Sequence, residues 1–250
     1  MKIGKMLLVI GLFSLSGIAY GAGETPGHGA HWGYKGDTAP DRWSTLKPEY
    51  GACSGRNQSP INLYGMIEAE MEPVQFHYKA GGHEVVNNGH AIQVNFEAGS
   101  GISADGIRFD LKQFHFHSPS ENQIDGKSFP LEAHLVHSDK EGNLAVVSVV
   151  FDEGEANPVV GAAWEQMPKA EGGKKALPGN VEATGLLPTN RDYYRYNGSL
   201  TTPPCTEGVR WIVMKKPMTV SKQQIEVFQT TLGFANNRPV QPVNARPILK

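Results

Sequence analysis

The chain has 250 residues, with 23 Lys and Arg against 25 Asp and Glu, so its formal net charge is -2. This balance gives no basic footprint for a nucleic-acid partner, and two cysteines exclude a disulfide-rich miniprotein or a four-cysteine zinc module. A hydrophobic content of 39% is too high for a disordered chain. The 29 Gly and 17 Pro exceed the usual share in soluble domains and favour a turn-rich globular fold over a helical bundle.

Residues 1–21 have the pattern of a secretory signal peptide. Two lysines precede an almost wholly apolar stretch at residues 6–17, and small residues occupy the -3 and -1 positions of a cleavage site around Tyr20. The apolar stretch is shorter than the roughly 20 residues that a membrane span needs. We therefore predict a periplasmic or secreted protein, with residues 22–250 as one mature domain that has no membrane segment.

Strand patterns dominate the rest of the chain. Residues 91–96 alternate between apolar and polar side chains, and residues 144–151 form a β-branched run typical of a fully buried strand. Asp-Gly pairs, which favour tight turns, precede two further strand patterns. The two strand patterns that follow Asp-Gly pairs lie at residues 107–116 and 131–137. A further strand pattern lies at residues 208–215. A short helix is predicted at residues 222–231, with Ser221 as its N-cap.

Three histidines are expected to converge on one face of the predicted sheet. His115 and His117 are two residues apart on a strand, so their side chains point to the same side. If the next strand returns antiparallel, it brings His134 toward them. Three imidazoles with a fourth position open are typical of a catalytic Zn²⁺ site. Gln113 and Glu132 have the matching parity to accept hydrogen bonds from the outer ring nitrogens.

The residues alone leave a second metal site open. The spacing from His115 and His117 to Glu121 also fits the first metal motif of cupins, in which Glu121 would be a ligand of an oxygenase or isomerase. His137 has the opposite parity, so we interpret it as a core histidine. No chemistry is assigned to four others, His28, His31, His77 and His83.

Several segments together resemble the α-class carbonic anhydrases, in that family's order and over nearly the whole mature chain. They are 31–34 (HWGY), 57–62 (NQSPIN), 87–90 (NNGH), 113–117 (QFHFH), 120–121 (SE), 132–137 (EAHLVH), 198–204 (GSLTTPP) and 237–242 (NRPVQP). The signal peptide and cysteine pair are similar to the exported bacterial members. The resemblance implies a mainly β (α+β) fold: a large, twisted, mostly antiparallel central sheet of about ten strands with short peripheral helices.

The resemblance also implies reversible hydration of CO2 to bicarbonate and a proton, by attack of a zinc-bound hydroxide. His115, His117 and His134 match the zinc ligands, and Gln113 and Glu132 match their hydrogen-bond acceptors. Two further catalytic residues match by motif: Thr201, which orients the hydroxide, and Glu121, which accepts from the Thr201 hydroxyl. This role makes Glu121 a partner of Thr201 and argues against the cupin site.

The remaining implied roles concern the proton and the substrate. His90 matches the proton-shuttle histidine, and the water network beside it would be held by Tyr34, Asn88 and Gln93, the last replacing an Asn common in the family. The substrate pocket would be lined by Val136, Val146, Leu200, Thr202, Val209 and Trp211. Sulfonamides and other anions are the expected inhibitors at zinc, and a homodimer is possible by analogy.

The two cysteines are expected to form a disulfide, and one rival function has to be considered. In an exported protein, Cys53 and Cys205 are most simply one disulfide, which would tie down the Thr201 loop; the alternative is two buried thiols. The rival is a catalytically inactive binding protein derived from the same family. Such relatives typically lose a zinc-ligand histidine, and this chain retains all three.

Overall fold

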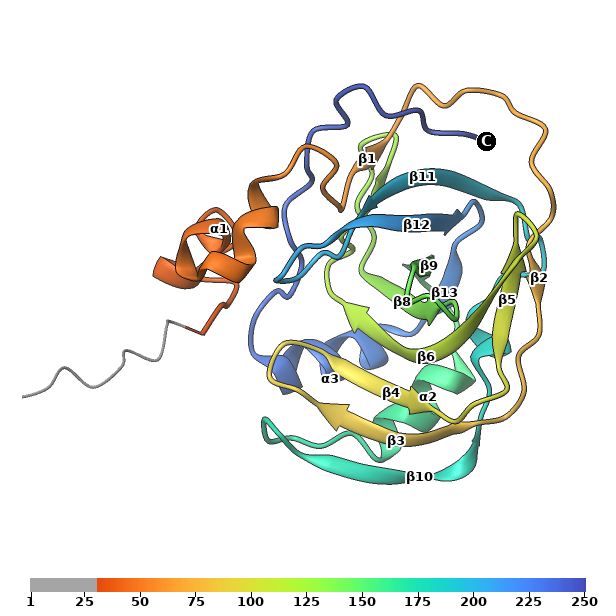
Figure 1. Cartoon of the computed structure of the whole chain (residues 1–250). Helices are drawn as coiled ribbons and strands as arrows, with labels where there is room; N and C mark the ends of the chain where they lie inside the picture. Colours follow the sequence, from red (N-terminus) through yellow and green to blue (C-terminus); the bar gives the residue numbers. More distant parts are fainter. Residues whose placement is uncertain (1–30) are drawn as a thin grey trace, which may run out of the picture.

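A computed structural model describes residues 31–250 (Figure 1). The predicted signal peptide and His28 lie outside the described residues. Within them, strands dominate: one sheet has 11 strands and a second has two. The prediction of a large, mostly antiparallel sheet of about ten strands is confirmed. No helix between residues 31 and 250 is both long and apolar enough to cross a membrane.

The large sheet has the strand order β10-β3-β4-β6-β8-β9-β12-β11, with β5 and β2 continuing from β6 and β13 beside β9. All pairings in it are antiparallel except β12 with β9 and β13 with β9. The bounds are β2 (Gln75–Phe76), β3 (Gly82–Asn87), β4 (Ile92–Phe96), β5 (Gly101–Ala104), β6 (Ile107–His117), β8 (Leu131–Ser138), β9 (Leu144–Glu153), β10 (Lys174–Val181), β11 (Tyr193–Ser199), β12 (Glu207–Met214) and β13 (Met218–Val220). The two-stranded sheet pairs β1 (Asn62–Leu63) with β7 (Gln123–Ile124) in parallel.

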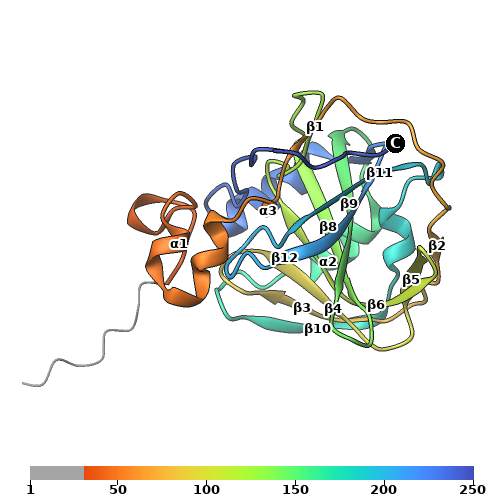
Figure 2. The same cartoon turned by 45° about the horizontal axis from the view of Figure 1, so that its top comes forward.

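Helices lie along one face of this sheet (Figure 1). They are α2 (Pro158–Glu165) and α3 (Lys222–Leu232), whereas α1 (Trp43–Leu46) and three short 3-10 helices (Gly36–Thr38, Pro48–Ser54, Ala183–Leu186) occupy connections. The predicted start of α3 is confirmed, because Ser221 and Gln224 form a reciprocal capping box. Figure 2 shows the segment that contains α1 lying beside the sheet and not over it.

The five predicted strands are all present, and side-chain alternation divides them between two cores. On β6, Phe114 and Phe116 pack into the core beneath α2 and α3, while His115 and His117, which alternate with them, face the opposite side. On β9, Ala145 to Phe151 are all buried, which explains the uninterrupted apolar run. This alternation separates a helix-covered face from the face that carries the candidate site.

The two Asp-Gly pairs both form tight turns with positive φ at both residues. The first joins β5 to β6 directly, because Ala104 pairs with Ile107. The second connects Ile124 to Lys127 by a small bridge, so it closes a local loop between β6 and β8 instead of linking the two strands itself. The antiparallel return of β8 on β6 is nevertheless confirmed.

Candidate metal centre and active site

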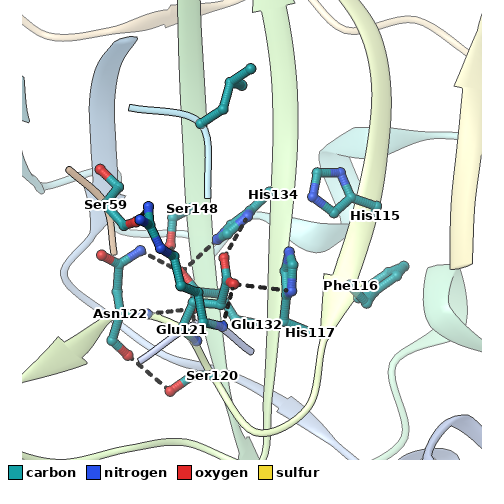
Figure 3. Close-up of polar contacts among 12 residues, drawn as sticks. Ser59, His115, Phe116, His117, Ser120, Glu121, Asn122, Glu132, His134 and Ser148 are labelled. Atoms are coloured by element: carbon teal, nitrogen blue, oxygen red, sulfur yellow. Dashed lines mark hydrogen bonds and ion pairs between the residues drawn. The ribbon is translucent and has the colours of Figure 1, made fainter. Parts of the chain in front are cut away.

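Three imidazoles from two neighbouring strands face one another (Figure 3). His115 and His117 on β6 point to the same side, and His134 on β8 is the direct cross-strand partner of His115. One ligating nitrogen from each ring lies within 4.8 Å of those of the other two. The convergence predicted from strand parity is confirmed. His137, which has the opposite parity, is buried on the other face. Its Nε2 atom forms a hydrogen bond with the Tyr78 hydroxyl, at 2.9 Å.

Each of the three rings has its outer nitrogen next to an oxygen atom. The contacts are His115 Nδ1 with Gln113 Oε1 at 2.9 Å, His117 Nδ1 with the Asn236 carbonyl oxygen at 2.7 Å, and His134 Nε2 with Glu132 Oε1 at 2.9 Å. These oxygens accept hydrogen bonds, so in a neutral ring the outer nitrogen carries the proton and donates, and the inner nitrogen keeps a lone pair. The Asn236 carbonyl was not anticipated, because a backbone acceptor has no side-chain signature in the sequence.

The described residues fit a divalent metal ion at this place. The inner nitrogen of His117, Nε2, is buried and has no hydrogen-bond partner among the described residues. Burial, followed by the neighbouring His117 and His134 rings, holds the pKa of His115 well below its usual value. Burial likewise lowers the pKa of His117, against the opposing effect of the Asn236 carbonyl. In their neutral form, the three rings offer converging lone pairs, a three-nitrogen donor set suited to Zn²⁺.

Glu132 is held as a carboxylate by several donors. Its Oε2 accepts from the backbone N–H groups of Glu121 and Asn122, at 2.6 and 2.8 Å. Its Oε1 accepts from the Asn122 side chain and the Ser148 hydroxyl, in addition to His134. Burial alone would raise the pKa of Glu132, but the His134 ring and these hydrogen bonds hold it at about 2. A fixed negative charge therefore lies behind His134.

Glu121 lies beside the His117 and His134 rings and is almost fully buried. Its Oε1 accepts from the backbone N–H of Arg238 at 2.8 Å and lies 3.5 Å from His117 Nδ1. Burial raises the pKa of Glu121 to about 7, while His134, the Arg238 N–H and the Thr201 hydroxyl oppose that rise. Within residues 31–250, no donor reaches Oε2 of Glu121 with good hydrogen-bond geometry. A bound cation would favour the carboxylate form further.

The segment around Thr201 is tied to the N-terminal part of the chain. The predicted disulfide between Cys53 and Cys205 is present. The Arg238 guanidinium, which is almost fully buried, donates to the Cys53 and Ser59 carbonyls and to the Gln58 side chain. Arg238 thus links the disulfide to the carboxylate of Glu121. Sequence reasoning gave it no individual role, although it belongs to a motif that carried the family resemblance.

Most residues predicted for the substrate pocket belong to one apolar cluster. Its members include Val136, Val146, Leu200, Val209 and Trp211. The Trp211 ring lies edge-on to His134, with ring centroids 4.9 Å apart. Thr202 follows on the same loop and is half-buried. An apolar wall therefore adjoins the three histidines.

The predicted proton network lies nearer the surface. His90 is half-buried and stacks on Trp32, with ring centroids 3.7 Å apart. Burial, then the neighbouring His31, lowers the pKa of His90 to about 4, although Glu171 opposes the shift. The Tyr34 hydroxyl is buried and has no hydrogen-bond partner among the described residues.

The amides of the predicted network are partly engaged elsewhere. Asn88 Oδ1 accepts from the backbone N–H groups of His90 and Ala91, which fixes the turn before β4. The Gln93 side chain donates to Asn95 at 2.6 Å. Since Gln93 is the cross-strand partner of His115, it nevertheless lies beside the three histidines.

The chain is similar to known proteins along most of its length. The family model described as eukaryotic-type carbonic anhydrase matches residues 38–250. The chain is 46% identical over 220 residues to a carbonic anhydrase of Pectobacterium carotovorum, covering 88% of this chain and 90% of the relative. It is also similar to the α-carbonic anhydrase of Thermovibrio ammonificans solved with sulfanilamide, at 51% identity and a TM-score of 0.87, covering 89% and 100% of the two chains. A hyperthermostable carbonic anhydrase from a hydrothermal vent chimney gives 54% identity and a TM-score of 0.86, covering 88% and 99%.

Proposed function

We propose that this chain, which belongs to the eukaryotic-type (α-class) carbonic anhydrase family, hydrates CO2. The reaction would use a Zn²⁺ ion held by His115, His117 and His134. The general reaction of the family is the reversible hydration of CO2 to bicarbonate and a proton, which makes its enzymes carbonate dehydratases. One observation carries the assignment of the metal. Three imidazoles, of which His117 and His134 are buried and His115 is half-buried, face one another, and each has its outer nitrogen next to an oxygen acceptor.

The bound ion would supply a Lewis acid that lowers the pKa of a water molecule to about 7, as in carbonic anhydrases generally. The chain's own contribution begins with the outer acceptors. Gln113, Glu132 and the Asn236 carbonyl fix each ring in one tautomer and orientation. Such contacts raise the basicity of the ligating nitrogens. The negative charge on Glu132 also offsets part of the positive charge of the ion.

Thr201 and Glu121 would orient the attacking oxygen. When Glu121 is ionised it can only accept a hydrogen bond, so the Thr201 hydroxyl must donate to it. The Thr201 oxygen is then left to accept from the attacking group and to direct a lone pair toward the CO2 carbon. The Arg238 N–H on Glu121 Oε1 supports this arrangement by fixing the carboxylate.

The substrate would bind against the apolar cluster beside His134. CO2 has no net charge and no dipole, so a wall of aliphatic and aromatic side chains suits it better than polar groups do. The members proposed are Val136, Val146, Leu200, Val209 and Trp211, with the Thr202 hydroxyl near the product. Sulfonamide anions are the expected inhibitors, which the sulfanilamide complex of the Thermovibrio relative supports.

The proton would leave through His90, with Tyr34, Asn88 and Gln93 holding the water between it and the metal. Burial holds the pKa of His90 at about 4, so the neutral ring, which is the form that can accept a proton, predominates at neutral pH. An imidazole needs only a short-lived charge to act in this way.

Export is part of the same proposal. Residues 1–21 would be removed as a signal peptide, which leaves residues 22–250 as a single periplasmic or secreted domain. The Cys53–Cys205 disulfide supports this location, because disulfides persist in oxidising compartments. Homodimerisation remains an expectation from family resemblance.

The test is stopped-flow CO2 hydration by the zinc-loaded chain, with and without a chelator. Hydration that the chelator abolishes and a sulfonamide inhibits is expected. A matched pair of variants separates the site from general effects. His115→Ala should lose both activity and bound zinc, whereas His83→Ala, which removes an exposed histidine on β3, should keep both. Zinc-independent hydration, or none at all, would exclude the proposal.

A further inference from the structure

One polar side chain interrupts the apolar run of β9. Residues 145–151 are all buried, and Ser148 carries the single hydroxyl among them. Placing a hydroxyl in apolar surroundings is unfavourable unless it forms a hydrogen bond, so a serine at this position needs a partner. The proposed function assigns Ser148 no role.

The partner of Ser148 is the carboxylate of Glu132 (Figure 3). Ser148 is the direct cross-strand partner of His134, so its side chain lies on the face of the sheet that carries the three histidines. Its Oγ atom lies 2.5 Å from Oε1 of Glu132. A carboxylate can only accept, so the hydroxyl donates. Within residues 31–250, this is the one hydrogen bond of the Ser148 side chain.

The other hydrogen bonds to Glu132 do not come from β9. Strand β8, which carries Glu132, lies between β6 and β9. The connection from β6 to β8 supplies the backbone N–H groups of Glu121 and Asn122 and the Asn122 side chain. His134, on β8 itself, supplies a fourth donor. Among the described residues, Ser148 is therefore the only donor that reaches Glu132 from the strand on its other side.

We propose that Ser148 is a positioning residue for the metal centre: it fixes Oε1 of Glu132 to the central sheet and thereby slows the release of a bound Zn²⁺ ion. Oε1 is the same oxygen that accepts from Nε2 of His134. A contact from β9 keeps the carboxylate from moving with the connection between β6 and β8, and the His134 ring then keeps its orientation. The ion leaves when a ligand turns away from it, so a fixed ring retains it longer. The inference rests on the proposed function, which supplies the identity of the ion.

Alanine is the informative replacement for Ser148. It removes the hydroxyl, keeps the backbone and Cβ, and places a methyl group among apolar neighbours on β9. Glu132 keeps its four other hydrogen bonds, so its charge is not left without donors. Faster loss of zinc from Ser148→Ala would therefore report the missing contact and not an unfolded site.

The test follows zinc release from the zinc-loaded full chain into an excess of a chromophoric chelator. Ser148→Ala should release zinc about 3- to 10-fold faster than the wild type, a smaller effect than the ~10- to 100-fold loss of affinity that follows removal of a direct outer partner. The control is Ser100→Ala, which removes another buried serine hydroxyl, one bonded to the Lys79 backbone, and should match the wild type. Release from Ser148→Ala that is no faster than from Ser100→Ala would overturn the inference.

The ring proton on Nε2 of His134 gives a readout that a general structural role would not move selectively. In the zinc-loaded chain, followed by NMR, this proton should exchange with water faster in Ser148→Ala than in the wild type. The Nδ1 protons of His115 and His117 should be unaffected, because they are bonded to other acceptors. No change at His134, or an equal change at all three rings, would contradict the role of Ser148.

Neither measurement uses CO2, so the two proposals can fail separately. A wild type that holds zinc but does not hydrate CO2 would overturn the proposed activity, and the release rates would still decide the role of Ser148. A wild type that binds no zinc would overturn both.

Discussion

The Nε2 atom of His134 lies 2.9 Å from Oε1 of Glu132, and this contact turns Nδ1 of His134 toward the other two imidazoles. His115 and His117 instead make their outer contacts through Nδ1. Glu132 and His134 are two residues apart on the same face of β8. One strand thus supplies both a metal-binding nitrogen and the carboxylate that orients it.

Glu132→Gln should weaken zinc binding by about 10- to 100-fold, the usual cost of losing such an outer partner. Glutamine keeps the shape of the side chain but removes the charge and an acceptor oxygen from a group that receives five contacts. Zinc affinity is measured by competition with a chromophoric chelator. Glu153→Gln, an exposed carboxylate at the end of β9, is the control. Equal zinc affinities for both variants would refute the role of Glu132.

Glu121→Gln should slow hydration by about 10²-fold or more while zinc stays bound, because positioning of the attacking group can contribute several kcal/mol. The amide can donate to Thr201 and so no longer requires the hydroxyl to donate. Metal content and stopped-flow rates on the same sample check this. Loss of the metal together with activity would instead mean that Glu121 is a ligand, as in the cupin motif.

His90→Ala should reduce turnover in weak buffer, by an amount that free imidazole restores. The physical reason is that the proton then has no positioned carrier and must leave through solvent alone. The measurement is the hydration rate as a function of imidazole concentration. A rate that neither falls in the variant nor responds to imidazole would exclude His90 from proton transfer.

We predict that the buried His137 lowers the free energy of unfolding in acid. Burial lowers its pKa to about 4, against the opposing effect of backbone carbonyls. The unfolded chain therefore binds the proton more readily, so the stabilisation is full above pH 6.5 and is lost as the pH falls toward 4. The expected loss is about 3 kcal/mol. Urea unfolding with a chelator present, in wild type and His137→Asn, isolates this histidine; parallel pH dependences would contradict the prediction.

Parity arguments predicted the metal-binding face, because side chains alternate strictly along β6 and β8. The strands that were not predicted, such as β3 and β10, contain glycine or proline and an irregular register, which weakens the alternation. The hydrogen bonds that Asn236 and Arg238 make to the site could not be predicted from the sequence either. Each acts through a backbone atom brought to the site from about 120 residues away along the chain, and local pattern contains no information about such contacts.

The most direct test of the metal assignment is a zinc titration of the chelator-stripped chain, with CO2 hydration measured at each point. We predict that activity rises linearly and stops rising at one zinc per chain. His117→Ala should bind no stoichiometric zinc and gain no activity. Activity without zinc, or full activity in His117→Ala, would contradict the assignment of the three histidines.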